Sequence, residues 1–174
     1  MFSFITDLFR SDNANFEERY QRSNHATATG GRTISYDPTL VHSLKKDHAT
    51  LVDLFQRIWD EGFQQRDFYR LAHLLTLFKS GFQAHLIKEN VRFYVYLEQH
   101  LAGDVHTLQV VKDFRTDMNE IANAVMHFCK RYNHEAFSEQ MLRSFERDYR
   151  KVGEALTRRV SLEEKELYIL YEPA

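Results

Sequence analysis

The feature that most constrains the fold is a set of mostly apolar residues at α-helical spacing, which recurs in four long segments. We call each set a stripe and expect its members to face the protein core. In the first segment these positions are separated by 4, 3, 4 and 3 residues, the spacing of one face of an α-helix. The four stripes are Leu44, His48, Leu51, Phe55 and Ile58; Phe78, Phe82, His85, Glu89, Phe93 and Tyr96; Phe114, Met118, Ile121, Val125 and Phe128; and Val152, Leu156, Arg159, Glu163, Leu167 and Leu170. Only 6 Gly and 2 Pro argue against a turn-rich β fold, so the sequence predicts an all-α protein.

Capping residues bound these segments. Asp37 followed by Pro38 predicts a helix start, Gly62 predicts a helix end, and Asp104 can cap a later helix. The expected helices span residues 38–61, 66–101, 104–132 and 135–170. Long helices joined by short loops are typical of an antiparallel up-down four-helix bundle.

The two halves of the expected bundle repeat each other. The first and third stripes are offset by 70 residues, and the second and fourth are offset by 74. The latter two segments are HLIKENVRFYVYLE and RVSLEEKELYILYE. Two related helical hairpins predict a bundle with an internal twofold repeat.

The chain divides into an N-terminal arm and the bundle. Residues 1–36 combine a short apolar segment, Phe2 to Phe9, with a polar linker that contains Gly30 and Gly31. We expect the apolar segment to pack on the bundle or on a second subunit, which leaves a homodimer or another protein partner open. Residues 37–174 are expected to fold without the arm.

Composition excludes several other classes of partner. The 23 basic and 25 acidic residues are interspersed and the net charge is −2, so nucleic acid is not an expected partner. No apolar run approaches the roughly 20 residues that span a bilayer, so integral membrane association is not expected. The single cysteine, Cys129, suggests a reducing compartment and hence a cytoplasmic location.

Five polar residues interrupt the apolar stripes: His48, His85, Glu89, Arg159 and Glu163. A charge that faces a helical core must be paired, hydrogen-bonded or bound to a metal, because burying it alone costs several kcal/mol or more. His85 and Glu89 are four residues apart on one helix face, and Arg159 and Glu163 repeat that spacing. We therefore expect all five side chains to meet in one layer.

These residues resemble the hemerythrin-like (HHE cation-binding) family, whose bundles carry a histidine on the first helix, H-x-x-x-E on the second, and the same set on the third and fourth. The resemblance covers about residues 38–171 and is clearest in LKKDHATLVDLF and the two repeat segments. In that family the histidines ligate two iron ions that the carboxylates bridge. The resemblance implies that His48, His85, Glu89 and Glu163 are at metal-ligand positions.

Two positions depart from the family pattern. Met118 stands where the third-helix histidine is expected, Arg159 stands where the fourth-helix histidine is expected, and Phe114 would fill the same half of the site. A thioether, a phenyl ring and a permanent cation are poor ligands for a second iron. We therefore expect at most one Fe, Zn or Mn ion, and a sensory or regulatory role rather than oxygen carriage.

A metal-free reading remains open. The guanidinium of Arg159 can neutralise Glu89 and Glu163 itself, which would leave an interaction or structural module without bound metal. An enzyme is not expected in either case, because no nucleophile–base arrangement or phosphate-binding loop stands out.

Overall fold

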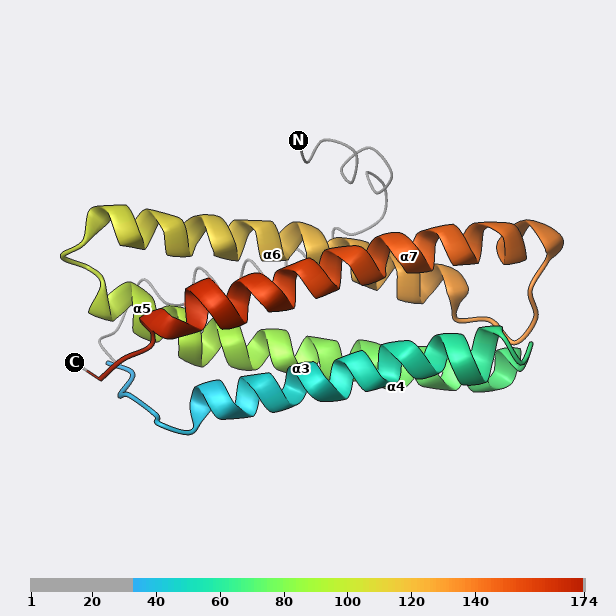
Figure 1. Ribbon diagram of the computed structural model, residues 1–174, viewed down its shortest axis with the longest axis horizontal. Coiled ribbons are helices and arrows are strands. Elements are labelled where there is room, and N and C mark those ends of the chain that lie inside the picture. Colours follow the sequence, from blue (N-terminus) through green and yellow to red (C-terminus); the bar gives the residue numbers. More distant parts are fainter. Residues whose placement is uncertain (1–32, 174) are drawn as a thin grey trace.

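The computed structural model describes residues 33–173, and all regular secondary structure in that range is helical. Four rods are formed, each from one or more consecutive helical elements (Figure 1). Their elements are α3 (Leu40–Arg57) with the π-helical turn η2 (Ile58–Phe63); α4 (Phe68–Lys88), the π-helical turn η3 (Glu89–Tyr94) and α5 (Val95–His100); α6 (Val105–Tyr132); and α7 (Glu139–Leu162), the π-helical turn η4 (Glu163–Leu167) and the 3₁₀ turn η5 (Tyr168–Leu170).

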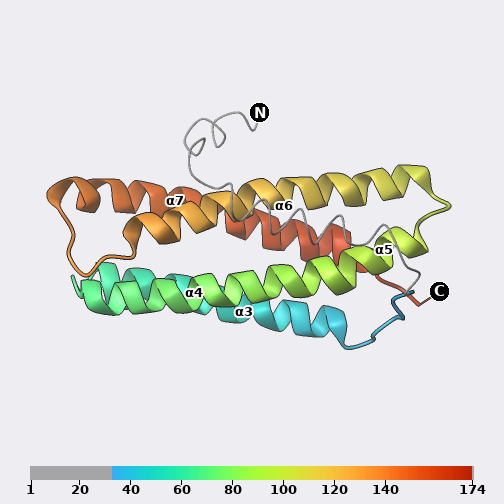
Figure 2. The ribbon, with the colours of Figure 1, turned by 180° about the vertical axis from the view of Figure 1, so that it is seen from behind.

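The rods form an antiparallel up-down bundle. In Figure 1, α3 and α4 lie in one layer and α6 and α7 in the other, and the reverse view in Figure 2 shows the same pairing. The α3–α4 turn and the α6–α7 loop lie at one end of the bundle. The start of α3, the α5–α6 loop and the chain's last residues lie at the other. The predicted all-α four-helix bundle is confirmed.

Of the two helix-start caps predicted, Asp104 is confirmed and Asp37 is not, because Thr39 is the residue that precedes the first helix. The Asp104 carboxylate accepts a hydrogen bond from the Thr107 amide at 3.1 Å and caps α6, as predicted. The Asp37 carboxylate accepts from the Thr39 amide at 2.9 Å, although the regular helix begins only at Leu40. The fourth helix starts later than predicted, because the extended residue Ser138 supplies its cap.

Gly62 is not the helix end that its position suggested. It lies inside η2 and is buried, and a Cβ added there would lie 2.7 Å from Leu71 Cβ. The glycine is therefore needed because η2 and α4 approach each other closely. The chain turns four residues later, at Arg66, whose φ is 54°.

The predicted stripes form the core. All of their members are buried except Phe114, Ile121, Leu156 and Leu170, which are half-buried. The core consists of two apolar clusters, one containing Leu44 and the other containing Leu51, on either side of His48. A polar layer thus separates two apolar regions.

The last residues of the expected arm contact the bundle. The Ile34 amide donates to Gln99 Oε1 at 3.0 Å, and the Tyr36 ring stacks on Tyr171 with centroids 5.0 Å apart. Residues 1–32, with the apolar segment and Gly30 and Gly31, lie outside the described residues. Within residues 33–173, no helix is both long and apolar enough to cross a membrane.

We predict that Gly62→Ala lowers the free energy of unfolding by about 1–3 kcal/mol, because the new methyl group must displace Leu71 or shift the backbone. Gly103→Ala is the matched control, since a Cβ there meets no atom within 4 Å. Urea denaturation of both variants measures the effect. Equal stabilities would show that the η2–α4 contact relaxes freely.

Candidate metal centre

The five polar stripe residues meet in one buried layer, as predicted. His48 comes from α3, His85 from α4 and Arg159 from α7, while Glu89 and Glu163 are the first residues of η3 and η4. None of the five residues is more than 4% exposed. The layer is therefore desolvated, and each charge in it depends on its neighbours.

His48 lies between two carboxylates. Its Nε2 is 3.2 Å from Glu163 Oε2, and its Nδ1 is 2.9 Å from Glu164 Oε1. Burial opposes a charge on the ring, but the hydrogen bonds to Glu163 and Glu164 outweigh burial and raise the pKa of His48. The metal-free site therefore favours an imidazolium at this position.

His85 is in a different electrostatic environment. Its ring centroid is 4.8 Å from that of His48, and its Nε2 is 4.0 Å from Glu89 Oε2. Its Nδ1 lies 3.5 Å from Asp47 Oδ2, and Lys88 Nζ holds that carboxylate at 2.6 Å. Burial and the charge of His48 lower the pKa of His85 to about 4. His85 is therefore a neutral imidazole near pH 7, the form that binds metals.

Each of the three guanidinium nitrogens of Arg159 donates a hydrogen bond. Its Nε donates to Glu163 Oε1, its Nη1 donates to the Phe114 carbonyl at 2.8 Å, and its Nη2 donates to the Tyr94 hydroxyl at 2.7 Å. The guanidinium also lies over the Phe114 ring, 5.1 Å from the centroid. The predicted Arg159–Glu163 ion pair is therefore present.

The two glutamates are in contrasting states. Burial opposes ionisation of Glu163, but His48 and Arg159 outweigh it and lower its pKa. Burial and repulsion by Glu163 raise the pKa of Glu89. The Tyr168 hydroxyl donates to Glu89 Oε1 at 3.2 Å, whereas Glu89 Oε2 has no hydrogen-bond partner among the described residues.

Two buried tyrosines belong to the layer, and sequence reasoning missed both. Tyr94 and Tyr168 each lie five residues after a layer glutamate, a spacing that turns away from the core face in a regular α-helix. The π-helical turns η3 and η4 start at those glutamates, and their i→i+5 hydrogen bonds bring the fifth residue back over the first. The two tyrosines are also 74 residues apart, like the two glutamates. This repeat is the sequence feature that could have identified them as residues of the layer.

Two carboxylates outside the stripes were also missed. By helical period Glu164 is expected on an exposed face, but it is half-buried and contacts His48. Asp47 is likewise half-buried and lies beside His85. These contacts form between different helices, so the spacing of residues along one helix does not predict them.

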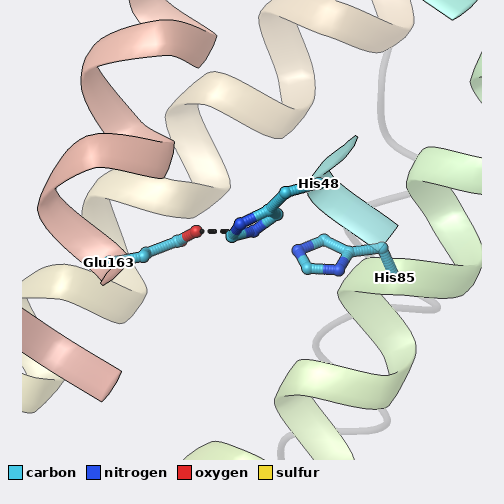
Figure 3. Close-up of side chains that lie close together, drawn as sticks. All are labelled: His48, His85 and Glu163. Atoms are coloured by element: carbon cyan, nitrogen blue, oxygen red, sulfur yellow. Dashed lines mark ion pairs between the residues drawn. The ribbon is translucent and has the colours of Figure 1, made fainter. Parts of the chain in front are cut away.

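The donor set fits one cation. One ligand atom each from His48, His85 and Glu163 lies within 4.8 Å of the others (Figure 3). Atoms bound to one ion at about 2.0–2.2 Å are at most about 4.4 Å apart, so a small inward movement of the side chains completes coordination. The unpartnered Glu89 Oε2 beside them would also gain a partner from a cation.

The donor set does not fit a second cation. Met118 is buried in the core and Arg159 fills the position opposite His85 in the repeat, so neither supplies a nitrogen ligand. Arg159 also occupies Glu163 Oε1, the oxygen that a bridging carboxylate would give to a second ion. The guanidinium of Arg159 therefore takes the place of a second metal ion in this half of the layer.

We predict that Arg159→Ala lowers the free energy of unfolding of the metal-free protein by about 3–5 kcal/mol, because it leaves Glu163 buried without its cation. Arg143, which is exposed on the same helix α7, supplies the control, and Arg143→Ala should stay within about 0.5 kcal/mol. Chemical denaturation measures both. A change below 0.5 kcal/mol in Arg159→Ala would contradict a structural role for this cation.

We predict that His85 reduces the stability of the metal-free protein as the pH falls from 6.5 toward 4. Its pKa is lowered to about 4 in the native state, so in this window the unfolded chain binds a proton that the native protein refuses. The stability advantage of wild type over His85→Gln should therefore shrink over this range. The difference between wild type and Phe82→Leu, which involves no titrating group, should stay constant.

Comparison with known proteins identifies the family of the chain. No curated protein and no solved structure matches the chain. The family model of the hemerythrin HHE cation-binding domain matches residues 39–171, which is most of the chain and includes the whole polar layer. The resemblance drawn from the stripe residues is confirmed, and the chain belongs to the hemerythrin HHE cation-binding domain family.

Proposed function

We propose that this bundle binds a single transition-metal ion through His48, His85 and Glu163, with Glu89 as the adjoining carboxylate. The observation that carries the proposal is the convergence of three buried ligand atoms within 4.8 Å. Two imidazoles and one or two carboxylates suit iron, zinc or manganese. Membership of a cation-binding family supports the same conclusion.

The hydrogen bonding of His48 supports metal ligation. Metal-bound histidines usually donate their second ring N–H to a carboxylate or carbonyl, which orients the ring. Glu164 lies at 2.9 Å from His48 Nδ1, and Asp47 lies at 3.5 Å from His85 Nδ1. The hydrogen bond to Glu164 thereby orients the His48 ring, whereas His85 Nδ1 lies near Asp47 but has no hydrogen-bond partner among the described residues. The Nε2 atoms of both rings face glutamates of the layer.

We infer a sensory or regulatory role rather than oxygen carriage or catalysis. Arg159 donates a hydrogen bond to Glu163 Oε1, so this oxygen is not available to bridge to a second iron as in the two-iron sites of the family. When bound, the metal would supply a positive charge that links α3, α4 and η4. Occupancy would then be coupled to the stability of the bundle, as a metal-responsive regulator requires. We place this role in the cytoplasm, with a protein partner or a second copy of the chain as the receiver.

One observation favours a second candidate, a metal-free interaction module. The three hydrogen bonds of Arg159 already compensate Glu163, and His48 takes a proton from solution readily. The layer is then charge-balanced without a metal. Metal analysis separates the two candidates.

We predict that the purified protein binds one ferrous ion per chain when loaded without oxygen, as measured by elemental analysis. His48→Ala and His85→Ala should each weaken binding by more than about tenfold, because each removes a ligand. The exposed His42 on the same helix as His48 is the control, and His42→Ala should bind normally. No bound metal in wild type would support the metal-free module.

The double variant Met118→His with Arg159→His tests the count of metal positions. It restores both nitrogen ligands of the family pattern and removes the cation, so its capacity should rise toward two irons per chain. Two irons with an oxo-bridge spectrum in the wild type would contradict a single site.

A further inference from the structure

Tyr168 is a buried group that faces the ligand cluster and has no role in the proposed site. Its side chain belongs to η5, directly after η4, and is 4% exposed. The hydroxyl oxygen lies 3.3 Å from His48 Nε2 and 3.2 Å from Glu89 Oε1. It therefore stands between two side chains whose inner atoms point at the same small volume.

The donor atoms form a chain of short, nearly equal distances. Glu163 Oε2 to His48 Nε2 is 3.2 Å, His48 Nε2 to the Tyr168 oxygen is 3.3 Å, and the Tyr168 oxygen to Glu89 Oε1 is 3.2 Å. Neighbouring donors around one ion at about 2.0–2.2 Å are about 2.8–3.6 Å apart in octahedral or tetrahedral coordination. All three distances lie in this range, so the phenol oxygen occupies a place that a ligand would occupy.

Packing holds the ring in this position. The Tyr168 ring lies parallel to the His48 ring within 12°, and Phe93 contacts it edge-on with centroids 5.0 Å apart. The π-helical turn η4 places Tyr168 on the same face as Glu163. The hydroxyl is therefore aimed by the fold and not by a flexible side chain.

The equivalent tyrosine of the repeat is used differently. The Tyr94 hydroxyl accepts a hydrogen bond from Arg159 Nη2 at 2.7 Å, on the half of the layer that the guanidinium fills. Tyr168 faces the histidine half instead. The chain thus offers a closely matched control within its own structure.

We propose that Tyr168 is a further oxygen ligand of the metal site and that it directs the site toward ferric iron. This inference rests on the proposed metal-binding function. On binding, one iron–oxygen bond forms and the Tyr168 O–H bond breaks, and the proton is released to solvent as metal ligands lose their protons. A phenol oxygen together with carboxylates is a hard donor set, which suits a trivalent iron better than zinc.

The experiment uses the full chain and ferric nitrilotriacetate as the iron source, so that no oxidant is needed. Iron content, visible absorption and resonance Raman spectra are recorded for wild type, Tyr168→Phe and Tyr94→Phe. We expect wild type to show a phenolate-to-iron charge-transfer band with phenolate ring modes in the Raman spectrum. Tyr168→Phe should lose the band and bind iron about tenfold or more weakly, whereas Tyr94→Phe should keep the band at the same intensity per iron.

The outcomes separate this inference from the proposed function. Wild type that binds one iron without phenolate modes overturns Tyr168 as a ligand and leaves the metal-binding proposal standing. Wild type that binds no iron overturns both. A band that persists in Tyr168→Phe overturns the assignment. If Tyr168→Phe does not fold, phenolate modes that are retained in Tyr94→Phe support the proposal, and their loss there overturns it.

Discussion

The structure depends on the mutual neutralisation of charged side chains in the middle of an apolar core. His48, Arg159 and Glu163 are nearly fully buried, and none could carry its charge there alone. Arg159 pairs with Glu163 along one helix, while Glu163 contacts His48 on α3 and Arg159 reaches Phe114 and Tyr94 on two other helices, so these contacts also set how the helices align. The apolar clusters on either side exclude water from the layer and thereby strengthen its interactions.

Comparison of the two halves of the internal repeat shows why the polar layer is chemically asymmetric. At the 74-residue offset Glu89 matches Glu163 and Tyr94 matches Tyr168, but His85 matches Arg159. One half therefore presents imidazoles and the other half presents a cation with three hydrogen bonds. Both halves have the same backbone geometry, including the π-helical turns, while the cluster of possible metal ligands combines the two histidines of the first half with Glu163 of the second.

The two histidines of the layer have pKa values shifted in opposite directions, and so do its two glutamates. Hydrogen bonds to carboxylates raise the pKa of His48, whereas burial and the charge of His48 lower that of His85. Arg159 and His48 keep Glu163 ionised, whereas burial and Glu163 raise the pKa of Glu89. A cation entering between the histidines would replace the proton on His48 as the charge that balances Glu163, which links metal binding to proton release.

The sequence by itself determined the four helices, the inward stripes and the five stripe residues of the polar layer. An α-helix has 3.6 residues per turn, so the residues of its buried face recur at that spacing in the sequence. The same period revealed Met118 and Arg159 as departures from a two-metal site. It was misleading where the backbone leaves that period or where two helices come close. The π-helical turns shift the phase and bring Tyr94 and Tyr168 inward, and the close approach of α4 gives Gly62 its role. Only the tertiary structure decided that Glu164 bonds to the His48 ring and that Asp47 lies beside His85, because those contacts depend on the rotation of each helix about its axis, which is set by packing against the others.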